Sequence, residues 1–430
     1  MKIKVTKMEY SKVCALTPPS HHRPIKQSVA MRKLIHTLSK KDLKKVGFTH
    51  TESGIDSLNS DEPVLYLMNH SSFIDLEIAS ALIYPKPYHI VCTSDGFVGK
   101  DGLMRRIGCI PTNKFVTDVV LVRDIAHALH NLKSSVLMYP EASYSFDGTT
   151  TPLPDTIGKC IKVMNVPVVM ISTKGAFHRD PLYNCLQVRD VKISAHMELI
   201  IPKEDIAYMT ADDIQKIIEK NFTYDHFKWQ KENNIKISES FRADGLNRIL
   251  YKCPQCLHEG KMKGMGTTLT CGNCGVEYTL NEYGYLECKD SLVPTTHSHK
   301  FDFSHIPDWY AWERYEVRKE LEAGTYSLDI PVKICMMVNT DSIYEVGTGR
   351  LSHDTNGFHL TGCDGELDYV QSPTASYSLY SDYYWYEIGD VICIGNMGVL
   401  YYCFPMDSGD VVAKTRLATE ELYKLLKAHA

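Results

Sequence analysis

Short, almost wholly apolar runs alternate with stretches of helical spacing between residue 61 and about residue 240. Such runs are typical of strands that are buried on both faces of a sheet. Residues 117–132 repeat their apolar positions at helical spacing. The alternation predicts an α/β domain with a mixed, largely parallel sheet flanked by helices, whose functional residues lie at the carboxyl ends of the strands. The predicted strands are residues 63–68, 88–92, 136–139 and 166–171.

The pattern changes in the last third of the chain. Residues 308–322 have helical spacing, and residues 326–404 contain short strand-like runs broken by Gly-rich and Asn-rich turns. A last amphipathic helix is predicted over residues 418–427. This order predicts an antiparallel β barrel-like domain closed by a helix, similar to domains of the pleckstrin-homology or GRAM kind.

These changes of pattern divide the 430 residues into four parts. The division agrees with the length, which is too great for one ordinary domain. The predicted parts are a basic helical segment (1–48), the α/β domain (49–245), a small cysteine-containing unit (246–290) and the β-rich domain (300–430).

The basic segment contains eight Lys or Arg and one acid, Asp42, between residues 23 and 45. Ser39 with Asp42 predicts a capping box that begins a second short helix, which ends at Gly47. A basic amphipathic helix can lie on an anionic membrane surface, or it can be a solvated helix packed on the next domain. The pattern alone leaves both open. The apolar positions of the first helix are Met31, Leu34, Ile35 and Leu38.

Composition and charge limit the class of protein, its partners and its cellular location. The apolar fraction of 44% is normal for a globular protein, and the net charge of −5 gives no reason to expect nucleic acid as a partner. No apolar run approaches the ~18 residues that a transmembrane helix needs. The first residues lack the uninterrupted apolar region of a secretory signal. Most of the fourteen cysteines are scattered, which predicts a reducing cytoplasm.

Four cysteines form an exception to this scatter. The sequences CPQC and CGNC contain Cys253, Cys256, Cys271 and Cys274, with fourteen residues between the two pairs. Two Cys-x2-Cys turns at about this separation predict a structural zinc ribbon in which all four thiolates bind the ion. A rubredoxin-like iron or a redox Cys-x2-Cys site explains the two pairs less well.

The spacing His-x4-Asp occurs three times. Only the first pair, His70 and Asp75, follows a buried strand and leads into a helix. At such a junction an imidazole can act as a general base and a carboxylate can fix its tautomer, while free backbone N–H groups can bind an oxyanion. The alternative is an N-cap histidine with a helix-surface aspartate. The three pairs are His70/Asp75, His297/Asp302 and His359/Asp364.

The first pair has three further stretches after it in a specific order. NHSSFID is followed by IGCIPTNKF (107–115), LMYPEASYSFDG (137–148) and VPVVMIS (166–172). In this order they resemble the four blocks of the glycerolipid acyltransferase family, which includes bacterial 1-acyl-glycerol-3-phosphate acyltransferase. The resemblance covers about residues 60–200 and implies that residues 49–245 have the acyltransferase fold.

The resemblance also implies roles for individual residues. His70 would be the general base and Asp75 its orienting partner. Tyr144 departs from the blocks, which have an arginine there, and Lys114 stands where another basic residue holds a phosphate. The implied substrate-binding residues are Asn69, Ser71, Lys114, Glu141 and Ser143. The cations that could compensate for Tyr144 are Arg105, Arg106, Arg123, Lys159 and Lys174.

The function implied by the resemblance is the transfer of a fatty acyl group from an acyl-carrier-protein or coenzyme A thioester to a hydroxyl of a lysophospholipid-like acceptor. Lysophosphatidic acid is the first acceptor to consider. An enzyme of this kind must reach lipid, which favours docking of the basic segment on an anionic membrane, peripherally at its cytoplasmic face. The alternative is a non-catalytic lipid-binding or adaptor protein on the same fold. A zinc-ribbon protein that binds nucleic acid fits the acidic total charge poorly.

Overall fold

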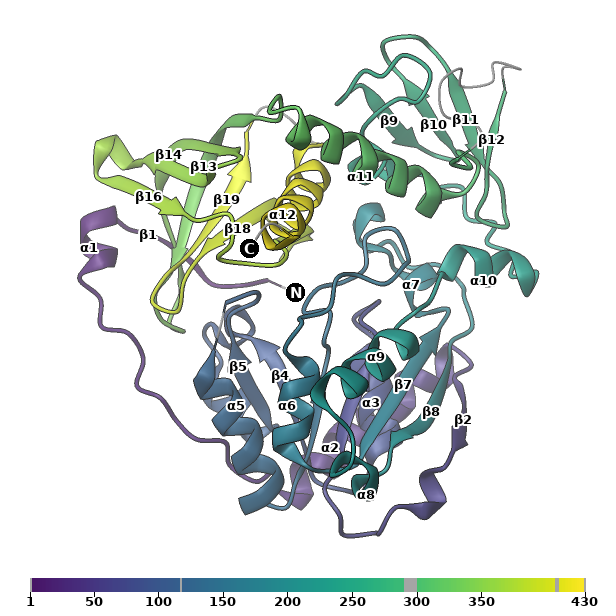
Figure 1. The fold of residues 1–430 in the computed structure, drawn as a ribbon, viewed down its shortest axis with the longest axis vertical. Helices are drawn as coiled ribbons and strands as arrows, with labels where there is room; N and C mark the ends of the chain where they lie inside the picture. Colours follow the sequence, from purple (N-terminus) through teal and green to yellow (C-terminus); the bar gives the residue numbers. More distant parts are fainter. Residues whose placement is uncertain (1, 117, 290–299, 407–409, 429–430) are drawn as a thin grey trace.

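The computed structural model describes residues 2–116, 118–289, 300–406 and 410–428 (Figure 1). Its lower part in Figure 1 is a sheet in the order β2-β8-β7-β3-β6-β4-β5, in which all pairs are parallel except β7 with β8. The predicted mixed, largely parallel sheet is therefore confirmed. The strands are β2 (Thr49–Ser53), β3 (Leu65–Met68), β4 (Tyr88–Thr93), β5 (Cys109–Thr112), β6 (Ser135–Met138), β7 (Val168–Lys174) and β8 (Ser194–Ile201).

Strand β3 lies in the middle of this sheet and is buried on both faces. Leu65 and Leu67 join the core formed with α5, α6 and α9, whereas Tyr66 and Met68 join the core formed with α2 and α3. This explains why β3 is apolar at every position instead of alternating. The helices are α2 (Val29–Lys45), α3 (Asp75–Ile83), α5 (Val119–Ala126), α6 (Ile157–Met164) and α9 (Ala211–Asn221).

Strands β2, β5 and β8 were not predicted. In β8, Ala195 and Met197 are buried, whereas His196 and Glu198, which follow them in turn, are partly exposed. This alternation is the signal of a strand with one buried face, and it differs from the continuous apolar runs on which the prediction relied. β5 is only four residues long.

The basic N-terminal region forms one helix instead of two. Ser28 caps α2 by accepting a hydrogen bond from the backbone N–H of Met31 at 3.2 Å. The helix runs through Ser39, which is buried, and Asp42 pairs with Lys45 instead of capping. The predicted capping box at Ser39 is therefore wrong, because the packing of α2 on α3 continues across it. Gly47, with a φ of 61°, follows the helix as expected.

The residues before α2 pack against the C-terminal part of the chain. Strand β1 (Val5–Lys7) pairs in parallel with β14 of the C-terminal sheet. The short helix α1 (Tyr10–Cys14) follows, and its Val13 enters the same core as that sheet. The chain then passes in an extended connection to α2 (Figure 1). The N-terminal residues thus connect two parts of the molecule.

The cysteine-containing unit is a small sheet in the order β12-β11-β10-β9, with all pairs antiparallel. It packs through one continuous core with α11 (Ile306–Glu322) and the C-terminal sheet. Trp309 and Trp312 of α11 are fully buried in that core. The strands are β9 (Met262–Met265), β10 (Thr268–Cys271), β11 (Glu277–Leu280) and β12 (Leu286–Cys288).

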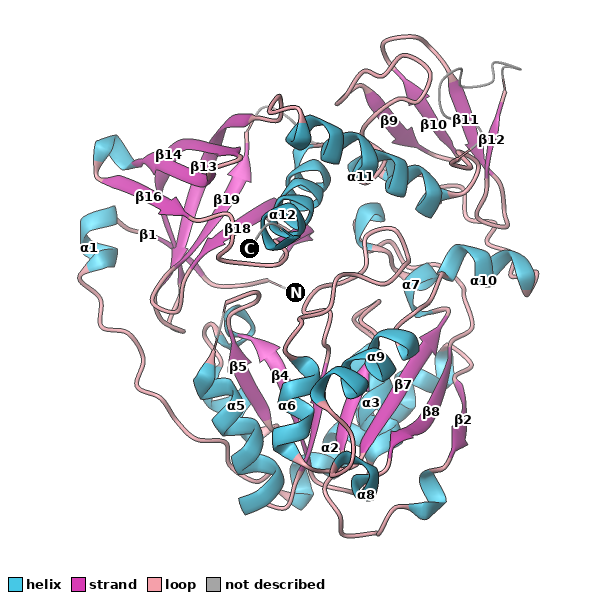
Figure 2. Ribbon diagram, in the orientation of Figure 1, coloured by secondary structure: helices cyan, strands magenta, loops and turns pink. Residues whose placement is uncertain are grey.

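The C-terminal strands form one antiparallel sheet in the order β16-β15-β14-β13-β19-β18-β17, and α12 (Val411–Ala428) packs beside it (Figure 2). The predicted antiparallel domain with a terminal helix is confirmed, but the closed barrel is wrong. Among the described residues β16 and β17 do not pair, and Tyr380 and Trp385 of β17 instead donate hydrogen bonds to Asp95, which follows β4. Assignment to the pleckstrin-homology or GRAM kind stays a prediction. The strands are β13 (Leu328–Met337), β14 (Ile343–Asp354), β15 (Gly357–Gly362), β16 (Leu367–Gln371), β17 (Tyr380–Trp385), β18 (Gly389–Gly395) and β19 (Leu400–Pro405).

A helix that crosses a bilayer must be long and largely apolar. Within the described ranges, none is both long enough and apolar enough to cross a bilayer.

Candidate active site

His70 lies in the loop between the end of β3 and the start of α3. Its Nδ1 is 3.1 Å from Oδ2 of Asp75, the first residue of α3. The same oxygen accepts the backbone N–H groups of Ser71 at 2.8 Å and Ser72 at 3.0 Å. An Nδ1–H that donates to Asp75 leaves the Nε2 lone pair free to take a proton. The structure therefore brings together the two residues that the sequence paired.

The backbone N–H groups of this junction differ from the expectation. We expected them to be free for an oxyanion, but those of Ser71 and Ser72 are bound to the Asp75 carboxylate. Asp75 is only 1% exposed, so these hydrogen bonds hold it in place and compensate its burial. Their role is to fix the carboxylate that orients His70.

Electrostatics keep His70 neutral near physiological pH. Burial lowers the pKa of His70, the hydrogen bond and the charge of Asp75 raise it, and the charge of Lys114 lowers it. The net direction is downward from the ordinary value of about 6.5. A neutral imidazole is the form that can accept a proton from a substrate.

Two tyrosine rings cover the faces of the His70 imidazole. The ring centroid of Tyr139 lies 4.1 Å away and that of Tyr144 lies 3.9 Å away, both stacked. Phe73, which is half exposed, lies 5.5 Å from Tyr144. Tyr144 therefore packs on the imidazole at the position where the related blocks have an arginine. The stacking on both tyrosines fixes the plane of the imidazole ring.

Glu141 holds the backbone of His70 in place. It is fully buried and accepts hydrogen bonds from the backbone N–H of His70 at 3.2 Å, the backbone N–H of Thr151 at 2.8 Å and the Tyr224 hydroxyl at 2.8 Å. Burial raises the pKa of Glu141 to about 7, although these donors lower it. In the structure all of these contacts are with the protein itself, and one of them positions the backbone of His70.

Asn69 and Ser71 connect the end of β3 to neighbouring elements through hydrogen bonds. Asn69 Oδ1 accepts the backbone N–H of Thr173 in β7 at 2.8 Å, and its amide donates to Ser71 Oγ at 3.1 Å. Ser71 Oγ also lies 3.3 Å from Nε2 of His226. All of these side chains except that of Thr173 come from loops or helix ends beside His70. Asn69 and Ser71 are buried, so they stabilise the loop that carries the imidazole.

The C-terminal part of the chain completes the site from the opposite side. Arg416 of α12 donates to Ser143 Oγ at 2.8 Å, and the Lys114 ammonium lies 4.4 Å from the ring centroid of Tyr380 in β17. Nothing local in the sequence links residues 380 and 416 to the motifs. Arg416 was not among the cations expected to compensate for Tyr144. Arg105, which was, pairs with Asp101 at 2.8 Å.

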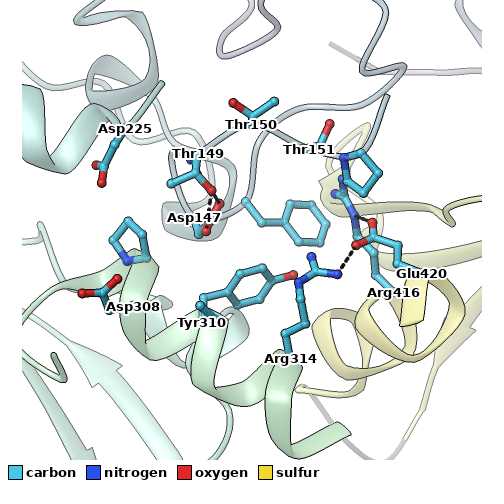
Figure 3. A pocket seen from close by; sticks show the side chains of 14 residues that line it. Asp147, Thr149, Thr150, Thr151, Asp225, Asp308, Tyr310, Arg314, Arg416 and Glu420 are labelled. Carbon is cyan, nitrogen blue, oxygen red and sulfur yellow. Dashed lines mark hydrogen bonds and ion pairs between the residues drawn. The ribbon is translucent and has the colours of Figure 1, made fainter. Parts of the chain in front are cut away.

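A cavity of about 280 Å³ lies between this helix, α11 and the loop after Ser145 (Figure 3). On one side Glu420 pairs with Arg314 at 2.7 Å and with Arg416 at 3.1 Å. Thr151 also lines the cavity, and its backbone N–H donates to Glu141. The cavity thus borders the residue that holds the backbone of His70, and its polar lining comes from the middle and the C-terminal part of the chain.

Of the other two His-x4-Asp pairs, His359/Asp364 does not form. His359 lies 2.8 Å from Asp368 and not beside Asp364, on an exposed part of the C-terminal sheet. His297 lies outside the described residues.

The four cysteines converge as predicted. Each offers a sulfur, and the four sulfurs lie within 4.8 Å of one another. Cys253 and Cys274 are 3.7 Å apart, as are Cys256 and Cys271. A tetrahedral zinc with bonds of about 2.3 Å requires sulfurs about 3.8 Å apart, so the donor set fits the ion. No other group of three or more His, Cys, Asp or Glu in the described ranges converges in this way.

Comparison with known proteins identifies the part of the chain that carries His70. Residues 49–174 match the model of the family described as Acyltransferase. This part of the chain is an acyltransferase domain. The match ends at the last residue of β7 and leaves the zinc-ribbon-like unit and the C-terminal sheet outside. The resemblance carried by the sequence blocks is confirmed for this domain.

One solved structure is similar over part of the chain. It is the crystal structure of the 1-acyl-sn-glycerophosphate (LPA) acyltransferase PlsC from Thermotoga maritima, with a TM-score of 0.37 and 15% identity. The similarity covers 48% of this chain and 81% of PlsC. None of the curated proteins matches the sequence.

Proposed function

We propose that the chain is an O-acyltransferase in which His70 is the general base. The observation that carries the proposal is the His70–Asp75 pair at 3.1 Å, at the carboxyl end of β3 within the acyltransferase domain. The donor is a fatty acyl thioester of coenzyme A or of acyl carrier protein. The acceptor is the hydroxyl of a lysophospholipid-like molecule, and lysophosphatidic acid is the acceptor that the sequence resemblance favours.

The reaction follows from the geometry of the imidazole. Nε2 removes the proton of the acceptor hydroxyl as its oxygen attacks the thioester carbonyl. The tetrahedral intermediate collapses, the carbon–sulfur bond breaks, and the imidazolium returns the proton to the leaving thiolate. Asp75 stabilises the imidazolium while it exists, and the rings of Tyr139 and Tyr144 keep it in one orientation.

Docking on an anionic membrane is part of the proposal. On α2, Leu34 and Leu38 are more than half exposed between exposed lysines. Phe73 and Leu76, at the start of the helix that α2 packs against, are also exposed. Apolar side chains among cations suit the interface of an anionic bilayer. Because Phe73 contacts Tyr144, this surface leads to the imidazole.

The cysteine cluster is proposed to hold a structural zinc ion through Cys253, Cys256, Cys271 and Cys274. Bound there, the ion would fix the two turns of the ribbon, whose core is shared with α11 and the C-terminal sheet. The ribbon supports the wall of the site opposite His70, and it is given no part in acyl transfer.

The test is thioester-dependent acyl transfer by the wild type, His70→Ala and His359→Ala. The last variant is the control, because His359 has the same spacing to an aspartate but lies on the exposed C-terminal sheet. We expect His70→Ala to lose a factor of roughly 10²–10⁴ in rate, as removal of a general base does, and His359→Ala to keep wild-type activity. Equal rates for the wild type and His70→Ala would reject the proposal. Lipid binding without transfer by the wild type would favour the non-catalytic alternative.

A further inference from the structure

Strand β17 places two side chains of the C-terminal sheet toward the acyltransferase domain. Tyr380 and Asp382 are two residues apart on a strand, so they project from the same face. Their pairing with β18 is regular at both positions, opposite Cys393 and Val391, and the irregularity in this strand begins only after Asp382. Because the Tyr380 ring lies against Lys114, Asp382 lies on the face that looks toward that lysine.

Lys114 is held among carboxylates on this wall. Its ammonium is 4.4 Å from the Tyr380 ring centroid, and the Tyr380 hydroxyl donates to Asp95, which also accepts from Trp385 Nε1 at 3.2 Å. Burial lowers the pKa of Lys114, and the charges of Asp382 and Asp95 raise it. The net direction of the Lys114 pKa is downward, so the two carboxylates offset the burial of the lysine charge only in part.

The arginine nearest the third sequence block is also occupied. Arg416 uses Nε for Glu420 at 3.1 Å and Nη2 for Ser143 at 2.8 Å, and its guanidinium lies 4.5 Å from the ring centroid of Phe146. Only 3% of the residue is exposed. At the position of the missing arginine, Tyr144 stacks on His70. Neither Arg416 nor Tyr144 offers the planar fork that binds a phosphate by two hydrogen bonds.

A phosphate monoester would meet this arrangement poorly. It carries a charge of about −1.5 to −2 at pH 7, and near His70 it would face the carboxylates of Asp75 and Asp382 together with Lys114, whose charge Asp382 and Asp95 offset in part. An uncharged hydroxyl head group needs only hydrogen bonds, which the Lys114 ammonium, the Asp382 carboxylate and the Tyr144 hydroxyl can supply. The charges around the site therefore favour an acceptor with an uncharged head group over one with a phosphate monoester.

We propose that Asp382 is a specificity-determining residue that faces Lys114 from the C-terminal sheet and offsets part of its charge, so that the enzyme accepts an uncharged glycerolipid alcohol in preference to one with a phosphate monoester. This inference rests on the proposed acyl transfer by His70, but it departs from the phosphorylated acceptor that the sequence resemblance favours. It also gives the C-terminal sheet a role, because the sheet supplies the residue that selects the acceptor.

The experiment compares kcat/KM for monoacylglycerol and for lysophosphatidic acid with the same thioester donor. Asp382→Asn removes the charge but can keep the hydrogen bond that Asp382 Oδ1 accepts from the backbone N–H of Tyr383 at 2.9 Å. The matched control is Asp368→Asn, on the exposed edge of the same sheet. The wild type and the control are expected to prefer monoacylglycerol. Asp382→Asn is expected to shift the ratio roughly tenfold toward lysophosphatidic acid, because it removes one of the two carboxylates that offset the charge of Lys114.

Two results would overturn the inference: a wild type that prefers lysophosphatidic acid, or a ratio that Asp382→Asn leaves unchanged. If Asp382→Asn does not fold, Lys114→Met serves instead and should move the ratio further from lysophosphatidic acid; an unchanged ratio there also contradicts the inference. Failure of the proposed function has a different signature, since the wild type would then acylate neither acceptor in a His70-dependent way.

Discussion

The His70 site has two walls of different origin. The near wall comes from strand ends of the acyltransferase domain, where His70, Asp75, Tyr144 and Glu141 lie within two short stretches of sequence. The far wall comes from β17 and α12 of the C-terminal part, which reach Lys114 and Ser143. In the proposed reaction the near wall contains the groups that move a proton, and the far wall contains the charges that surround the acceptor. The proposal therefore places chemistry and substrate choice on separate parts of the fold.

The largest effect on the far wall should come from losing the metal. Cys253→Ser is expected to abolish binding of one zinc ion per chain and to lower the unfolding temperature, because the ribbon shares its core with α11 and the C-terminal sheet. Metal analysis and thermal unfolding measure both. The control is Cys288→Ser, an exposed cysteine outside the cluster, which should keep the zinc. Full zinc content in Cys253→Ser would refute the four-cysteine site.

A smaller effect should follow from separating the two walls at α12. Arg416→Met leaves Ser143 without this donor and Glu420 with Arg314 as its remaining ion-pair partner, which we expect to cost about 3 kcal/mol of unfolding free energy, as for other broken buried pairs. Urea unfolding measures the loss. Arg350→Met, which breaks an exposed pair with Asp329, should change stability little. Equal stabilities for the two variants would mean that α12 does not hold the walls together.

The smallest effect concerns how lipid reaches the near wall. Lys33→Glu with Lys40→Glu on α2 should weaken sedimentation with phosphatidylserine vesicles several-fold, because each basic side chain near the surface contributes roughly 1 kcal/mol. These substitutions leave β1 on the C-terminal sheet, which a deletion of the N-terminal residues would remove. Lys261→Glu with Lys263→Glu on the ribbon gives the same charge change at a different place. Docking through α2 would be contradicted if both double variants bound equally.

The sequence predicted the near wall because its information is local. A continuous apolar run marks β3, and the order of the blocks after NHSSFID distinguishes His70 from the two other histidines with the same spacing. The cysteine cluster is likewise encoded by two short turns. Each of these features depends on residues that are close in sequence or fixed by a repeated spacing.

The far wall could not be predicted in this way. Asp382 and Arg416 reach the site only because the C-terminal sheet stays open at β17 and packs on the acyltransferase domain. Neither residue has a motif, and a Tyr-rich strand carries no sign of which sheet it will face. The single helix α2 was missed for a related reason, since tertiary packing on α3 overrode a local capping signal at Ser39.

The acid limb of the pH–rate profile tests the central claim most directly, because only a base that titrates in the reaction shifts it. Since burial lowers the pKa of His70, the wild-type midpoint for kcat/KM should lie below the ordinary value of about 6.5. Asp75 raises that pKa and Lys114 lowers it, so Asp75→Asn should move the midpoint down and Lys114→Met should move it up. A midpoint that is unchanged in both variants would contradict the assignment of His70 as the base.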